Sequence, residues 1–319
     1  MPAWRFNALS TILTFILPAT FCARGNFDIV HAQGLCGLRH NVITAHFCQA
    51  GWFAALEREN VRLDWKQKVA QCLVSPLEAR AFSRADCEVI AVSRRVAADL
   101  HDYYGCKSNI TVTYHGVDLD RFHPRNHLEF RDVLRAEIGA DRNAFLALYV
   151  GDVKKGAIPA IRSVAKTDDV QLLIVTSSKT EDCRQLAQKL GISNRVMFHP
   201  LTKQIERIYA GVDALVFPTL YDAYGMVISE AMAAGLPVIT NSAAGAAEII
   251  TTGINGILTA SAWDDDAISR ELRRLRDDEQ LCRELGSAAR KTIERYSWDQ
   301  VASDTLQVYR RILSRTKYL

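Results

Sequence analysis

Short apolar runs alternate with longer helical patterns along the chain, and this alternation constrains the fold more than any other feature. Arbitrary loops do not produce it, because each apolar run is bounded by turn residues and followed by a segment with helical spacing. The alternation predicts βαβ units, with parallel sheets covered by helices on both faces. The candidate strands are DIVHA, NVITAH, EVIAVS, ITVTYHG, FLALYVG, VQLLIVT, RVMFHP, ALVFPT, PVITN and GILTA.

The length of 319 residues suggests about two domains in such an α/β protein. A polar stretch, DRFHPRNHLEFRDVLRAEIGADRN, separates two series of strands and carries a proline and mixed charges. We therefore expect a first Rossmann-like domain over residues 1–125, a linker over 126–143 and a second Rossmann-like domain over 144–295. The helical pattern over residues 296–319 should pack back towards the first domain.

Composition excludes some classes of partner. Lysine and arginine exceed acidic residues by 39 − 36 = 3, without a compact basic run, so we expect no nucleic-acid partner. Eight scattered cysteines without a CxxC pair indicate reduced thiols in a cytoplasmic protein. A pI near 8.4 permits peripheral association with the anionic inner face of a membrane, although no basic amphipathic helix requires it.

The first 23 residues allow two interpretations. One early arginine followed by an apolar run resembles a secretory signal, but the run is too short and too polar to span a bilayer. Apolar residues within 6–17 recur near helical spacing, and a candidate strand follows almost at once. We therefore favour a helix that packs in the core.

The segment YDAYGMVISEAMAAGLPVI, residues 221–239, carries the most chemical information. A strand ends before it, Asp222 lies on the following loop, and a helix begins at about Met226. Gly225 lets the backbone approach a ligand, and the free N–H groups of the first helical turn bind anions such as a diphosphate. Glu230, about one turn into the helix, could accept both hydroxyls of a ribose, while Asp222 could accept hydroxyls of a group on the far phosphate. The alternative is an ordinary α/β connection with Asp222 as a helix cap.

From about residue 86 to 312 the chain resembles the retaining glycosyltransferases of family 4, which have the two-Rossmann GT-B architecture with domains facing a cleft. Their Glu-x7-Glu signature is matched in spacing and context from Asp222 to Glu230, with Asp in place of the first Glu. The segments VIAVSRRVAADL, VTYHGVDLDRFHP, LYVGDVKKG and AAGAAEIITTGINGIL resemble further family segments in the family's order. The family usually has more strand-helix units before FDIVHAQG, so the resemblance implies an incomplete first domain.

The resemblance places a phosphate clamp in the loop VGDVKKG. Lys155 matches the family's lysine, whereas Asp152 stands where the family has an arginine, and Lys154 is a candidate replacement. A cation there stabilises the charge that develops on the leaving diphosphate. The alternative for both lysines is a solvated loop. The donor-binding residues expected on these grounds are Gly151, Lys154, Tyr224, Gly225, Met226, Val227 and Glu230.

A histidine ends the candidate strand NVITAH. The resemblance gives His46 a place near the transferred sugar and the acceptor, where imidazole can bind a hydroxyl or assist proton transfer. The alternative is a packed histidine, and His31 is a weaker candidate. The expected catalytic residues are His46, Asp222 and Lys155.

These features predict transfer of a hexose-type sugar from a nucleoside-diphosphate sugar to a carbohydrate or lipid-linked hydroxyl acceptor, with retention, in polysaccharide or glycolipid biosynthesis. No cofactor and no metal are expected, because lysine and the helix dipole supply positive charge. The alternatives are a catalytically impaired nucleotide-sugar-binding or scaffold protein and, less favoured, a GT-B sugar-nucleotide epimerase.

Overall fold

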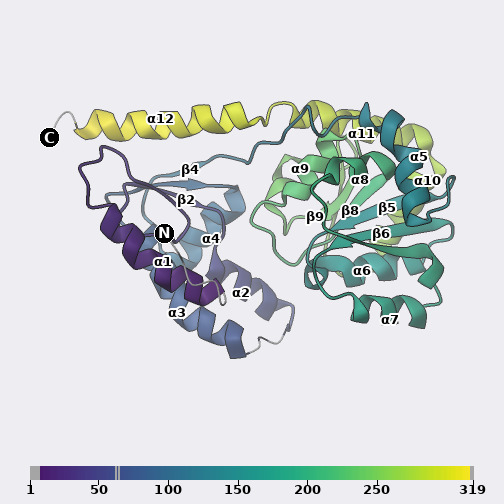
Figure 1. Cartoon of the computed structure of the whole chain (residues 1–319), viewed down its shortest axis with the longest axis horizontal. Helices are drawn as coiled ribbons and strands as arrows, with labels where there is room; N and C mark the ends of the chain where they lie inside the picture. Colours follow the sequence, from purple (N-terminus) through teal and green to yellow (C-terminus); the bar gives the residue numbers. More distant parts are fainter. Residues whose placement is uncertain (1–7, 62, 64, 317–319) are drawn as a thin grey trace. The chain divides into compact units, whose positions relative to one another are not determined.

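The computed structural model describes residues 8–61, 63 and 65–316, and the chain forms two compact units (Figure 1). Unit 1 contains the chain up to His115 together with the residues from Asp299 onward, and unit 2 is Gly116–Trp298. Each unit contains one parallel sheet, and every candidate strand of the sequence overlaps an observed one. The predicted α/β architecture with two parallel-sheet domains is confirmed.

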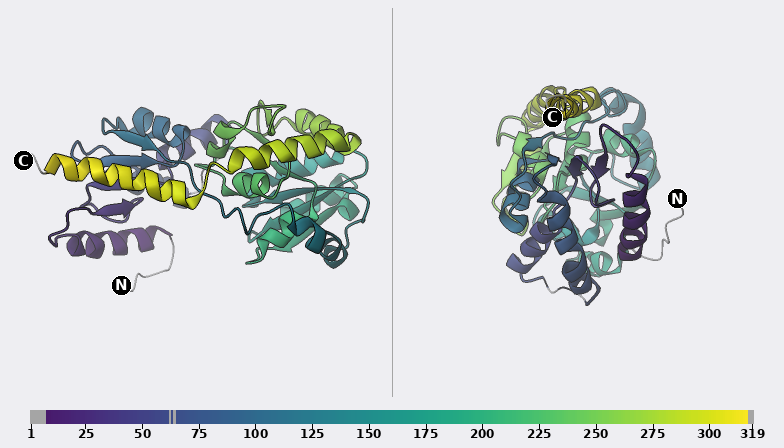
Figure 2. Two further views of the ribbon diagram at one scale, coloured as in Figure 1. Left: turned by 90° about the horizontal axis from the view of Figure 1, so that it is seen from above. Right: turned by 90° about the vertical axis from the view of Figure 1, so that its left-hand side faces the viewer.

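Unit 1 has a four-stranded sheet in the order β1-β2-β3-β4, in which every pairing is parallel. The C-terminal helix α12 belongs to this unit: its Val308 is buried with Val42 and Ile90 (yellow at the C-terminus in Figure 2). The elements are α1 (Ala8–Cys22), β1 (His31–Gln33), β2 (Val42–Ala45), α2 (Gln49–Arg58), α3 (Trp65–Phe82), β3 (Glu88–Ala91), α4 (Arg94–Tyr104), β4 (Ile110–Val112) and α12 (Trp298–Thr316).

The amino-terminal segment is helical, as expected, but it is not a core helix throughout. Within α1, Ile16 is buried, whereas Leu17 is 73% exposed and Phe21 is 68% exposed. The expectation of a packed side chain is therefore wrong for Leu17, while Ile16 is buried and Thr20 Oγ1 accepts a hydrogen bond from Leu38 N–H at 2.9 Å. The expected contact of Phe6 lies outside the described residues. In the part of the chain that the structure describes, no helix combines the length and the apolarity needed to cross a bilayer.

Unit 2 has a six-stranded parallel sheet in the order β10-β9-β8-β5-β6-β7. The strands are β5 (Phe145–Val150), β6 (Val170–Thr176), β7 (Val196–Pro200), β8 (Ala214–Phe217), β9 (Val238–Asn241) and β10 (Ile257–Thr259). The helices are α5 (Asn126–Ile138), α6 (Val153–Ala165), α7 (Glu181–Lys189), η1 (Ser193–Arg195), α8 (Ile205–Gly211), α9 (Met226–Ala233), η2 (Gly245–Ile249), α10 (Asp265–Asp277) and α11 (Glu279–Ile293).

The strand order of unit 2 reverses between β5 and β8. From β5 the chain adds β6 and β7 on one side, then returns to β8 and adds β9 and β10 on the other. Accordingly α6 and α7 cover one face of the sheet, and α8 and α9 cover the opposite face (Figure 1). In open α/β sheets the loops at such a switch point separate and leave a crevice outside the carboxyl ends of the strands, where ligands bind.

The segment expected as a linker, residues 126–143, differs from that expectation: most of it is helix α5, which belongs to unit 2. Arg135 provides the physical reason. Its side chain is 1% exposed, forms an ion pair with Asp213 at 2.6 Å, and donates hydrogen bonds to the carbonyls of Gly211 and Ala144 at 3.0 and 2.8 Å. A polar, arginine-rich sequence suggests a solvent-exposed segment. Here the Arg135 guanidinium instead fixes α5 to the sheet.

Replacing Arg135 by methionine should lower the free energy of unfolding of unit 2 by about 3–5 kcal/mol, because it leaves buried acceptors without a donor. Urea unfolding followed by circular dichroism measures the loss. The exposed Arg142→Met is the control, with an expected change within about 0.5 kcal/mol. Equal unfolding midpoints for the two variants would contradict the role of Arg135.

Candidate functional site at the switch point of unit 2

Two loops at the switch point carry most of the residues predicted from the sequence. Gly151 and Asp152 connect β5 to α6, on which Lys154 and Lys155 lie in the first turn. The loop from Pro218 to Gly225 connects β8 to α9. The topology thus brings together two segments about 70 residues apart in the sequence, at the edge of the sheet where ligands bind.

A backbone contact fixes the distance between these loops. A Cβ atom on Gly156 would lie 1.6 Å from the carbonyl oxygen of Pro218, so only glycine allows α6 to approach the β8 loop this closely. The neighbouring Lys155 therefore reaches across the switch point, and its Nζ lies 2.7 Å from Oδ2 of Asp222. Asp222 is thus oriented by a charge-assisted hydrogen bond, and the N–H of Tyr224 donates to its other oxygen at 3.3 Å.

The backbone of the Asp222 loop is held independently of the carboxylate. The Asp222 N–H donates to Ala243 O at 2.9 Å, and Gly245 N–H donates to Asp222 O at 3.0 Å. Earlier in the loop, Asn241 accepts from Thr219 N–H and donates to its carbonyl. The N-cap of α9 is Gly225 rather than Asp222, so the alternative of Asp222 as the helix cap does not describe this geometry.

Two helices begin at the crevice, and they differ as anion sites. Asp152 caps α6, since its carboxylate accepts from Lys154 N–H at 2.9 Å, so that end already has its negative charge. Helix α9 begins at Gly225, in the left-handed conformation with φ of 89°, which has no side chain to cap it. The first-turn N–H groups of Met226 and Val227 have no acceptor within the helix, so α9 is the end that offers donors and a positive dipole to a phosphate.

Glu230 lies in the second turn of α9, away from the pair formed by Lys155 and Asp222. The hydroxyl of Tyr209, on α8, donates to its Oε2 at 2.8 Å. Burial raises the pKa of Glu230, while the Tyr209 hydrogen bond and the charge of Arg121 oppose this shift. No motif marks Tyr209 as a functional residue, so it was not predicted from the sequence. This 1%-exposed tyrosine fixes one oxygen of the Glu230 carboxylate, Oε2.

The side chain of Tyr224, the aromatic residue between Asp222 and Gly225, is buried and packs inside unit 2. Tyr224 is 3% exposed, its hydroxyl accepts a hydrogen bond from Ser229 Oγ at 3.1 Å, and burial raises its pKa to about 12. Its backbone is used internally as well, since its N–H donates to Asp222 and its carbonyl accepts from Ala246 N–H. Lys154, by contrast, is exposed, and its backbone N–H is used by the Asp152 cap.

His46 lies in unit 1, directly after β2, and is exposed. Its Nε2 is 2.8 Å from Oε1 of Gln33, and its ring stacks on His115 with centroids 5.4 Å apart and an interplanar angle of 10°. Burial lowers the pKa of His46, and burial together with repulsion from His46 lowers that of His115 to about 4. Both rings are therefore neutral near pH 7. His31 is used internally, by Thr44 and Tyr309.

Among the residues that the structure describes, no group of three or more histidine, cysteine, aspartate or glutamate side chains is placed to hold a metal ion. The positive groups at the switch point are the Lys155 ammonium and the start of α9.

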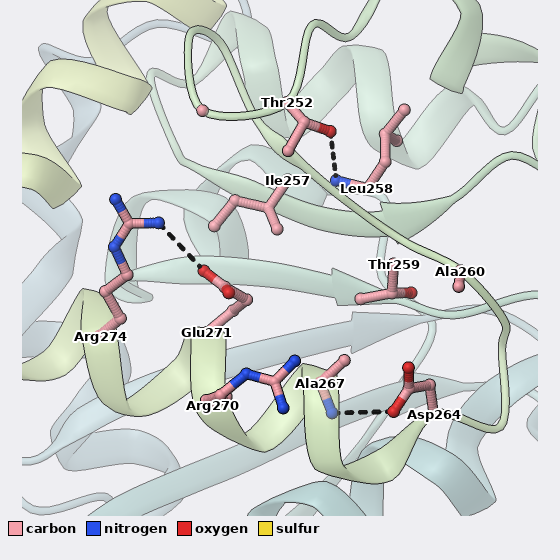
Figure 3. Close-up of a pocket in the computed structure, with 11 residues that line it drawn as sticks. Thr252, Ile257, Leu258, Thr259, Ala260, Asp264, Ala267, Arg270, Glu271 and Arg274 are labelled. Carbon is pink, nitrogen blue, oxygen red and sulfur yellow. Dashed lines mark hydrogen bonds and ion pairs between the residues drawn. The ribbon is translucent and has the colours of Figure 1, made fainter.

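A cavity of about 260 Å³ lies elsewhere in unit 2, between β10 and α10 (Figure 3). Arg274 pairs there with Glu271 at 3.4 Å, and Thr252 accepts from Leu258 N–H at 3.1 Å, while Arg270 also lines the cavity. None of the predicted residues lines it. The switch point, rather than this cavity, has the complementary charges that a substrate with a diphosphate needs.

Comparison with known proteins agrees with this fold. The family model described as Glycosyl transferases group 1 matches residues 130–292, and the model described as Glycosyltransferase Family 4 matches residues 1–121. The chain is a glycosyltransferase of GT-B type and belongs to the group 1 family.

Individual relatives are distant. The chain is 27% identical to the D-inositol 3-phosphate glycosyltransferase of Streptomyces avermitilis, over 92% of this chain and 70% of that protein. The sucrose-phosphate synthase of Thermosynechococcus elongatus superposes with a TM-score of 0.78 at 22% identity, covering 96% of this chain and 78% of that one. Anabaena HepE in complex with UDP and glucose superposes with a TM-score of 0.66 at 21% identity, covering 86% of this chain and 77% of that one. At these identities the structures show the shared fold, which confirms the expected GT-B architecture.

Replacing Gly156 by alanine should lower the free energy of unfolding of unit 2 by about 3 kcal/mol, because the new methyl group overlaps the Pro218 carbonyl. The control is Gly191→Ala, where φ is 72° and nothing lies within 4 Å of the added Cβ, with an expected cost of about 1 kcal/mol. Thermal unfolding compares the two. A smaller loss for Gly156→Ala than for Gly191→Ala would contradict the close approach.

The stability of Glu230→Gln relative to wild type should depend on pH. A carboxyl group whose pKa is raised on folding stabilises the fold fully below its ordinary value of 4.5, and this contribution is lost as pH rises through the raised pKa. Glutamine does not titrate, so the variant should gain on wild type between pH 4 and pH 7 in melting temperature. The exposed Glu284→Gln controls for the lost charge. A constant difference across this range would refute the pKa shift.

Proposed function

We propose that this protein transfers a hexose-type sugar from a nucleoside-diphosphate sugar to a hydroxyl acceptor with retention of anomeric configuration. The observation that carries the proposal is the 2.7 Å pair between Lys155 and Asp222 at the switch point, beside the open amino terminus of α9. A cation, a helix start and an oriented carboxylate are the groups needed to bind a diphosphate and an attached sugar.

In this proposal the diphosphate binds the first-turn N–H groups of α9 and the ammonium of Lys155. Negative charge grows on the leaving phosphate as the glycosidic bond breaks, so a cation at this position stabilises the transition state more than the ground state. Gly151 and Gly225 allow the backbone to approach the ligand, and no metal is required. Lys154 serves as a second, exposed cation.

The remaining carboxylates recognise the two rings of the donor. Glu230, held by Tyr209 through one oxygen, accepts hydroxyls of the ribose, and Asp222 accepts hydroxyls of the sugar. Retention follows by front-face attack, in which a donor phosphate oxygen accepts the proton of the acceptor hydroxyl. In unit 1, His46 binds a hydroxyl of the substrate.

The comparisons support a nucleotide donor and a carbohydrate-type acceptor. One structural neighbour is described with UDP and glucose, and another, TarM of Staphylococcus aureus, with UDP and α-GlcNAc-glycerol. We therefore take UDP-glucose as the first donor to test. The acceptor belongs to polysaccharide or glycolipid biosynthesis in this proposal, with the protein in the cytoplasm or peripheral to the inner face of the membrane.

Calorimetry with UDP-glucose and detection of released UDP test the proposal. Lys155→Ala should lower kcat roughly 10²–10³-fold, because it removes charge stabilisation from the leaving group. Lys154→Ala should cost less than Lys155→Ala, and the exposed Lys189→Ala is a control for the loss of one positive charge. Glu230→Ala should raise the Kd of the donor roughly tenfold with a smaller effect on kcat.

Three outcomes separate the candidate functions. Unchanged kinetics in both Lys155→Ala and Glu230→Ala would refute the assigned site. Donor binding without transfer to any acceptor and without UDP release would instead identify a nucleotide-sugar-binding protein. No binding of UDP-, GDP-, ADP- or dTDP-sugars would refute the proposed class of donor.

A further inference from the structure

Five polar side chains of unit 1 form one hydrogen-bonded row that ends at His46. Tyr309 Oη lies 2.7 Å from His31 Nδ1, and Thr44 Oγ1 lies 2.7 Å from His31 Nε2. The amide of Gln33 continues the row, since its Nε2 lies 3.3 Å from His31 Nε2 and its Oε1 lies 2.8 Å from His46 Nε2.

The strands explain why these residues meet. Strand β1 pairs in parallel with β2, so that Gln33 lies opposite Thr44 and His31 lies opposite Val42. His31 and Gln33, two residues apart on a strand, share one face of the sheet. His46 follows β2 by one residue, at the carboxyl end where the substrates of such sheets bind.

The orientation of the Gln33 amide, with its oxygen towards His46, sets the directions of these hydrogen bonds. The amide oxygen only accepts, so the Nε2 of His46 carries a proton. The amide nitrogen only donates, so the Nε2 of His31 is the unprotonated acceptor, and its one lone pair is shared by the Thr44 hydroxyl at 2.7 Å and, more weakly, by the Gln33 amide at 3.3 Å. His31 is then protonated at Nδ1 and donates to Tyr309.

The charge state agrees with this assignment. Burial lowers the pKa of His31, with smaller contributions from His46 and His40, and burial also lowers the pKa of His46. A neutral imidazole has one N–H and one lone pair. Because Gln33 holds the N–H of His46 at Nε2, the lone pair is at Nδ1, and the ring is kept in place by stacking on His115.

We propose that Gln33 is a positioning residue: braced by His31, it holds His46 in one tautomer, so that Nδ1 accepts a hydrogen bond from a hydroxyl of the sugar substrate. This inference deepens the proposed function, on which it rests for the identity of the ligand. His31, the weaker candidate for a substrate contact, is in this inference a brace behind Gln33. A substrate analogue without the hydroxyl, or with a group that only accepts, is rejected at this atom.

The test compares Gln33→Glu with Gln33→Lys in the full chain. Both variants introduce a charge at this position. Only glutamate still accepts a hydrogen bond from His46 Nε2, while only lysine keeps a donor towards His31. Lysine donates only, and should move the proton of His46 to Nδ1. Nuclear magnetic resonance of protein with ¹⁵N-labelled histidine, at about pH 8 so that the ring is neutral, locates the proton, and His46→Gln assigns the signal.

We expect an Nε2–H tautomer of His46 in wild type and in Gln33→Glu, and an Nδ1–H tautomer in Gln33→Lys. With UDP-glucose as the probe, kcat/KM for UDP release should fall roughly tenfold in Gln33→Lys, the effect of one lost hydrogen bond, and much less in Gln33→Glu. If Gln33 had only a structural role, kcat/KM for UDP release would fall equally in the two variants.

The reverse orientation of the Gln33 amide would place the proton of His46 on Nδ1, so that tautomer in wild type overturns the inference. Equal UDP release by the two variants also overturns it. Absence of UDP release from wild type would contradict the proposed function for this donor, while the tautomer of the free protein still decides whether Gln33 positions His46.

Discussion

The contact between Gly156 and the Pro218 carbonyl is the constraint on which the site depends. It sets the distance between the first turn of α6 and the loop after β8, and only this distance lets Lys155 meet Asp222. Gly156 is therefore required for packing, and this packing positions the preceding Lys155 beside Asp222. Since Asn241 and the Ala243–Gly245 backbone hold the β8 loop from the other side, both partners of the ion pair are attached to rigid elements.

Helix α9 shows how one short element can combine several recognition tasks. Its amino terminus is left open by a glycine with positive φ, its first turn offers N–H groups, and its second turn presents Glu230. Tyr209 orders that carboxylate from α8 without being a contact itself. Asp152 gives the neighbouring helix α6 a carboxylate cap, whereas α9 has no side-chain cap, so in the proposed function the diphosphate binds at α9.

Much of this could be derived from the sequence, and the rest could not for identifiable reasons. The strands were predictable because buried parallel strands are apolar along their whole length. The switch-point loops were predictable because glycines and a carboxylate directly after a strand indicate a ligand site at the carboxyl end of the sheet. Arg135 was not predictable as an anchor, since a buried guanidinium has the same sequence pattern as a solvated one. The contributions of Tyr209 and Gln33 depend on partners far away in the sequence, which no local pattern reveals.

In the proposed function, the ion pair at the switch point has a thermodynamic consequence for binding of the donor. Asp222 occupies the ammonium of Lys155 as an internal counter-ion before any phosphate arrives, so association exchanges one anion for another and gains less than an unpaired lysine would. The released carboxylate becomes available to the sugar in the same event. Binding of the phosphate and recognition of the sugar hydroxyls are thereby energetically linked. A nucleotide without its sugar should therefore bind with a less favourable free energy than the complete donor.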